Sequence, residues 1–103
     1  MNINAKVDWV GTPRRYTYVE NEIEYDALSI DFTLQDDDER YKLLILKYEQ
    51  ETRYEIKQYR VKPGKQKPYP VDTDYVFTNK TIPLIDTILQ DPYVQSYFGQ
   101  TQA

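Results

Sequence analysis

The chain contains neither cysteine nor histidine among its 103 residues. Without cysteine there is no disulfide, no thiol nucleophile and no thiolate ligand for a metal. Without histidine the commonest general base and the commonest transition-metal ligand are missing, so no Ser-His or Cys-His catalytic arrangement can form. These absences favour a protein that is not an enzyme and holds no cofactor or metal, although carboxylates, lysine and tyrosine still allow acid–base chemistry.

Long apolar runs are also lacking. No stretch of the sequence approaches the ~18 apolar residues that a membrane-spanning helix needs, and residues 1–10 alternate like a strand rather than resembling a signal peptide. The net charge of -4 favours solubility. We therefore expect no membrane partner and a cytoplasmic location, or a place in a virion if this small, acidic, tyrosine-rich chain is of phage origin.

Apolar and polar side chains alternate in several segments, as in strands with one buried face. The pattern is clearest at residues 27–34, where Leu28, Ile30, Phe32 and Leu34 share one face. Just upstream the apolar positions are odd-numbered, which predicts a bulge or a break near residue 26. We expect one domain over residues 1–103, with strands at about 3–10, 14–20, 27–34, 41–48, 53–62 and 71–77.

Residues 41–60 admit two interpretations. Residues 43–46 are all apolar, as in a central strand covered on both faces, but Tyr41, Leu44, Ile45 and Tyr48 also have helical spacing. A hairpin is favoured because the residues that follow are dense in strand formers and need a strand neighbour. The helix stays open, since the connection at 49–52 lacks glycine, asparagine and proline.

The C-terminal segment predicts two short helices, at about 81–90 and 92–98. Pro83 and Pro92 each fit the first turn of a helix, where the missing N–H costs little. The fold class that follows is α+β: an antiparallel meander of four to five strands, with the C-terminal pair of short helices packed on one face. The even-numbered residues of 28–34 are the surface that we expect the helices to cover.

Charge is segregated along the chain. Residues 16–39 hold nine acidic residues and no basic residue. Four of these acids are spaced by two, so on one strand they would share a face. Such a face protects an edge strand by its charge, docks a basic partner in the manner of a nucleic-acid mimic, or binds a divalent metal. The candidate acidic interaction face consists of Glu20, Glu22, Glu24 and Asp26.

Residues 57–70 hold five basic residues and no acidic residue. Prolines and tyrosines interleave with the lysines, which predicts a loop able to grip phosphates and stack on bases, or to clasp an acidic surface. Gly64-Lys65 lacks the other residues of a phosphate-binding loop, so nucleic acid is not the favoured partner. The basic candidates are Lys57, Arg60, Lys62, Lys65 and Lys67, with Tyr59 and Tyr69 as aromatic contacts.

Tyrosine is over-represented, with 11 residues against one tryptophan and three phenylalanines. Tyrosine supplies rigid, amphipathic contact area and is enriched at interfaces, although it also suits half-buried strand positions. We therefore expect a small non-enzymatic interaction or assembly subunit that binds another protein or further copies of itself. The alternatives are an acidic inhibitor of a nucleic-acid-handling protein, and weak nucleic-acid binding through residues 57–69.

Overall fold

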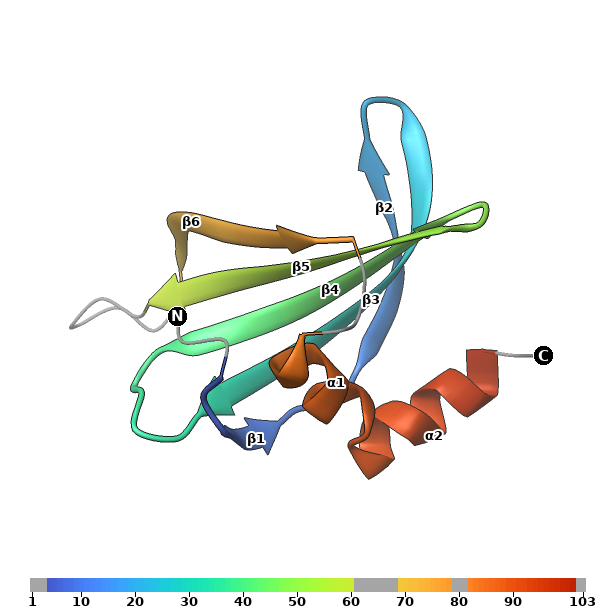
Figure 1. Cartoon of the computed structure of the whole chain (residues 1–103). Helices are drawn as coiled ribbons and strands as arrows, with labels where there is room; N and C mark the ends of the chain where they lie inside the picture. Colours follow the sequence, from blue (N-terminus) through green and yellow to red (C-terminus); the bar gives the residue numbers. More distant parts are fainter. Residues whose placement is uncertain (1–3, 61–68, 79–81, 102–103) are drawn as a thin grey trace.

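The computed structural model of the chain describes residues 4–60, 69–78 and 82–101. They form two layers, an antiparallel sheet and a pair of helices beneath it (Figure 1). The elements are β1 (Val7–Val10), β2 (Arg14–Glu20), β3 (Ile23–Leu34), β4 (Arg40–Tyr48), β5 (Glu51–Arg60), β6 (Tyr69–Phe77), α1 (Pro83–Leu89) and α2 (Pro92–Thr101). The α+β class and the C-terminal helix pair are as predicted, but in these residues the sheet has six strands rather than four to five.

The extra strand arises because β3 is long enough to pair with two strands on one edge. β2 lies along residues 23–29 of β3, and β1 lies along residues 32–34 on the same edge. Residues 11–13, which include Gly11 and Pro13, break the chain between β1 and β2. On its other edge β3 pairs with β4, and β4, β5 and β6 continue the meander.

Two tight turns set the registers of this meander. Asn21 and Glu22 join β2 to β3 with φ of 51° and 67°, the left-handed pair of values typical of a two-residue hairpin. Glu49 begins the turn between β4 and β5 with φ of 55°. Residues 41–60 are thus a hairpin and not a helix, although no glycine or asparagine marks the second turn.

The helices cover one face of the sheet, which we call the covered face. Leu28, Ile30, Phe32 and Leu34 of β3 lie on it, as the alternation at 27–34 predicted, and pack with α1 and α2 into one core. Their cross-strand neighbours on β4 and β5 complete the sheet side of this core: Tyr41, Leu43, Ile45 and Ile56. The helix side consists of Leu84, Ile85, Ile88 and Val94.

Proline and aspartate mark where the two helices begin. Pro83 occupies the first turn of α1, and the Thr87 hydroxyl donates to its carbonyl over 2.9 Å. Asp91 precedes α2, and its carboxylate accepts the Tyr93 N–H at 2.9 Å, as an N-cap does. Of the helices in the described part of the chain, none is both long and apolar enough to cross a membrane.

The open face of the sheet as a candidate interaction site

The face of the sheet opposite the helices is formed by residues that lie far apart in the sequence. Cross-strand pairing joins Tyr16 to Ala27, Ala27 to Leu46 and Leu46 to Arg53 in one row. A second row joins Trp9, Thr33, Arg40 and Tyr59. We call this surface the open face, and its members are Trp9, Tyr16, Tyr18, Tyr25, Ala27, Ser29, Asp31, Thr33, Arg40, Lys42, Leu44, Leu46, Tyr48, Arg53, Glu55, Lys57, Tyr59 and Val76.

Most of the exposed large apolar side chains lie on this face. Of the six large hydrophobic residues exposed in the described part of the chain, four belong to it. Their exposed fractions are 55% for Trp9, 41% for Tyr16, 39% for Tyr48 and 57% for Val76. Single exposed hydrophobic residues are common on protein surfaces, but several on one face are typical of an interaction site.

The side chains at the centre of the open face are nevertheless shielded from solvent. Leu44 and Leu46 are only 4% and 1% exposed, although no helix covers them. Both lie in the middle of the sheet, where their cross-strand neighbours are Ser29 and Ala27 of β3 and Glu55 and Arg53 of β5. At the edge of this face, burial raises the pKa of the Tyr16 hydroxyl, and the charges of Tyr18, Tyr59 and Glu55 raise it further.

Arg53 fixes one end of the open face. Its guanidinium lies 5.3 Å from the centroid of the Tyr25 ring, and Nη2 donates to Glu20 over 2.7 Å. Nε lies 3.0 Å from a Glu55 carboxylate oxygen but is not aligned for a hydrogen bond. Tyr25 also contacts Tyr48 edge-on at 5.8 Å, so this end is held by its own side chains.

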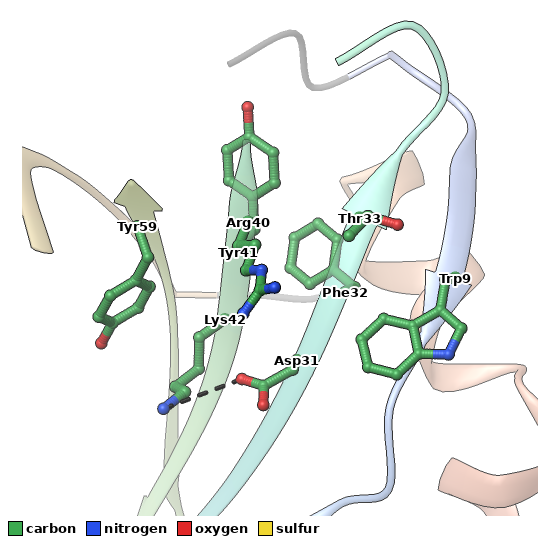
Figure 2. Close-up of a pocket in the computed structure, with 8 residues that line it drawn as sticks. All are labelled: Trp9, Asp31, Phe32, Thr33, Arg40, Tyr41, Lys42 and Tyr59. Carbon is green, nitrogen blue, oxygen red and sulfur yellow. Dashed lines mark ion pairs between the residues drawn. The ribbon is translucent and has the colours of Figure 1, made fainter. Parts of the chain in front are cut away.

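The other end of the open face is hollowed into a pocket of about 550 Å³ (Figure 2). Trp9 forms one side and Tyr59 lies on the other, with charged side chains of β3 and β4 between them. The Lys42 ammonium lies 3.8 Å from the Asp31 carboxylate and 5.3 Å from the Tyr59 ring centroid. The lining residues are Trp9, Asp31, Phe32, Thr33, Arg40, Tyr41, Lys42 and Tyr59.

The charges of this pocket do not cancel. Asp31 forms an ion pair with Lys42, whereas the Arg40 guanidinium makes no ion pair with any residue that the structure describes. One net positive charge therefore lies between two aromatic side chains, an arrangement that suits an anionic group attached to a flat or apolar one. No group of three or more acidic residues in the described ranges is placed to hold a metal ion.

Gly11 sets the position of Trp9. The Gly11 N–H donates to the Asp31 carbonyl over 2.7 Å, and a Cβ at this position would lie 2.8 Å from the end of the indole ring. The ring therefore packs directly over the glycine, which holds it at the rim of the pocket. A side chain larger than hydrogen would push the ring away from this position.

Gly11→Ala is thus expected to displace the indole and to destabilise the domain by about 1–3 kcal/mol. Because Trp9 is the only tryptophan, its fluorescence reports the change directly, and we expect emission at longer wavelength with stronger quenching by iodide. Thr12→Ala is the matched control, since Thr12 is exposed. Identical spectra for Gly11→Ala and the wild type would contradict this packing.

The structure separates the four residues of the predicted acidic interaction face. Glu20 ends β2 on the side of the open face and pairs with Arg53, whereas Asp26 pairs with Arg15 at 2.6 Å. The hydrogen bond from Arg15 lowers the pKa of the Asp26 carboxyl. Glu22 lies in the hairpin turn and Glu24 is exposed on β3. These acids therefore do not form one continuous ladder.

The basic candidates are also dispersed. Lys57 and Tyr59 belong to β5 and share the open face, and Arg60 at the end of β5 donates to Glu39 over 3.0 Å. Tyr69 begins β6, while its side chain and those of Lys62, Lys65 and Lys67 lie outside the described residues. The sequence pattern missed Trp9, Arg40 and Lys42 as site residues. Only the cross-strand register brings them together.

The fold and the site together define a small α+β domain with a helix-covered face and an open, aromatic face. Over residues 1–96 the chain matches the model of a family described as a protein of unknown function, DUF3910, and it belongs to that family. Neither the comparison with curated proteins nor the comparison with solved structures gave a match.

Proposed function

We propose that the domain is a non-enzymatic interaction or assembly module that binds another protein through its open face. The observation that carries this proposal is that four of the six exposed large hydrophobic residues in the described part of the chain lie on that face. Interfaces concentrate binding energy in a few aromatic and arginine side chains near their centre. Trp9, Tyr16, Tyr59 and Arg40 are residues of these types, and all four belong to the open face.

The pocket indicates the chemistry of the partner. Arg40 and Lys42 outnumber Asp31, and Trp9 and Tyr59 flank these charges. A protein segment that presents a carboxylate beside an apolar or aromatic side chain would satisfy the Arg40 guanidinium and bury the Trp9 ring. We therefore expect the partner to contribute an acidic segment at this end of the face.

The two alternatives stay predictions with less support. As an acidic inhibitor the chain would offer Glu20, Glu22, Glu24 and Asp26, but Glu20 and Asp26 are already paired with arginines. Nucleic-acid binding would depend on Lys62, Lys65 and Lys67, which are not among the described residues.

The proposal predicts that Trp9→Ala and Arg40→Glu each abolish capture of the native partner without unfolding the domain. Truncating an aromatic residue that anchors an interface costs about 2 kcal/mol or more, which is roughly a 30-fold loss in affinity. Tyr93→Ala is the matched control, because Tyr93 is 70% exposed but lies on α2, away from the open face. The measurement is quantitative cross-linking in native extracts, followed by titration against the identified partner.

Cross-links should map to the open face, and the partner should be lost from both open-face variants and kept by Tyr93→Ala. Equal recovery of the partner by all three variants, with their circular dichroism unchanged, would reject the open face as the binding surface.

A further inference from the structure

β2 is an edge strand with an unpaired side. It pairs with β3 on one edge, and no strand of the described residues pairs with the other. The hairpin that it forms with β3 projects beyond the rest of the sheet (Figure 1). Most proteins protect such an edge with charge, proline or a bulge, because its free N–H and C=O groups recruit another strand.

One hydrogen bond reveals which backbone groups face outward. The Arg15 N–H donates to the Tyr97 hydroxyl over 3.2 Å, so it points away from β3. In an antiparallel ladder the N–H and C=O of one residue point to the same side, and the side alternates along the strand. The outward-facing residues of β2 are therefore Arg15, Thr17 and Val19, whereas Tyr16 and Tyr18 bond to β3.

The sequence of β2 is complementary to itself about Thr17. When two copies are placed antiparallel with Thr17 opposite Thr17, Arg15 falls opposite Val19, and all three pairs can exchange outward hydrogen bonds. The same register places Tyr16 opposite Tyr18 and Arg14 opposite Glu20, because the two residues of each pair are equally far from Thr17 in the sequence. Aromatic and opposite-charge pairs of this kind stabilise neighbouring strands.

Other registers keep fewer of these pairings. A shift of two residues keeps the outward groups in phase but leaves only two of the three hydrogen-bonded pairs within β2, and Arg14 no longer faces Glu20. Centring the pair on Arg15 would place two like charges opposite each other. The register centred on Thr17 therefore has the largest number of favourable pairs within β2.

We propose that two copies of the chain associate through β2 in this antiparallel register, which makes one continuous sheet with a two-fold axis at Thr17. The partner is a second copy of the chain and the surface is the strand edge. The proposal therefore does not depend on the open face binding another protein.

Tyr97 competes with this pairing. The Tyr97 hydroxyl, on α2, accepts a hydrogen bond from the Arg15 N–H. In the dimer the same N–H would donate to the Val19 carbonyl of the second copy. Removing the hydroxyl leaves that N–H without its partner in the monomer, while the dimer still satisfies it. Tyr97→Phe should therefore strengthen association.

Thr17→Pro gives the sharpest test, because proline removes an N–H that points outward and so removes no bond to β3. Sedimentation equilibrium should give twice the chain mass of 12.4 kDa for the wild type and for Thr17→Val, which keeps the N–H. Thr17→Pro should sediment as a monomer with an unchanged circular dichroism spectrum. Arg14→Glu, an exposed change that sets like charges opposite each other, should weaken the dimer about tenfold.

A wild-type chain that is monomeric up to millimolar concentration would overturn the proposal. It would also be overturned if Thr17→Pro, or Arg14→Glu should the proline variant fail to fold, dimerised as tightly as the wild type. Loss of a foreign partner from the open-face variants, with self-association intact, would separate this proposal from the interaction function.

Discussion

Phe32→Ala is expected to destabilise the domain by about 3–5 kcal/mol, the cost of truncating a buried aromatic ring. Phe32 is buried in the core of the covered face, and its ring stacks on Tyr41 with centroids 5.5 Å apart. The Tyr41 hydroxyl in turn donates to Asp37, so the cavity left by alanine cannot close by a simple shift of Tyr41. Because small domains are stable by only about 5–15 kcal/mol, a large share of the stability should be lost.

Urea denaturation followed by circular dichroism checks this expectation. Tyr93→Ala is the control that removes a comparable ring from an exposed site on α2, and it should change the free energy of unfolding by less than about 0.5 kcal/mol. Equal losses for the two variants would show that the ring of Phe32 is not part of the core.

Leu43 and Leu44 offer a comparison within one strand, because they are adjacent and both buried but point to opposite faces of the sheet. Leu43→Ala should cost about 3–5 kcal/mol, since its surroundings are fixed by α1, β3 and β5. Leu44→Ala should cost about 2 kcal/mol, near the low end for such changes, because the side chains over the open face can settle or admit water.

The same denaturation experiment measures both variants, and the difference between them is the prediction. A cost for Leu44→Ala equal to or above that of Leu43→Ala would mean that a rigid layer, such as a bound partner, covers the open face as firmly as the helices cover the other.

The sequence pattern predicted the covered face better than the open one. The alternation at 28–34 marked the helix-covered side of β3, because residues that face one large core must all be apolar. The change of phase near residue 26 predicted a bulge or a break, yet β3 runs unbroken from Ile23 to Leu34. Its odd-numbered residue Tyr25 belongs to the open face, so two half-buried faces of one strand were mistaken for an interruption.

Turns and sites were harder to predict, for different physical reasons. Glu49 takes a left-handed conformation that local propensity assigns to glycine or asparagine, so the hairpin of β4 and β5 depends on the pairing of its strands. Trp9 and Arg40 are 31 positions apart, and only their shared neighbour Thr33 brings them to one row. Linear charge counts could not reveal this row, nor the arginines that neutralise Glu20 and Asp26.

The double pairing of β3 has a consequence for the order in which the domain assembles. From β2 to β6 each strand meets the next one along the chain, so these contacts close short loops and can form early. β1 instead joins the far end of β3, and the C-terminal helices return to pack near the start of the chain. Closing such long loops is slow. We therefore infer that a bare meander precedes the native state, and that its later-covered leucines and isoleucines are the surface at risk of aggregation while the chain folds.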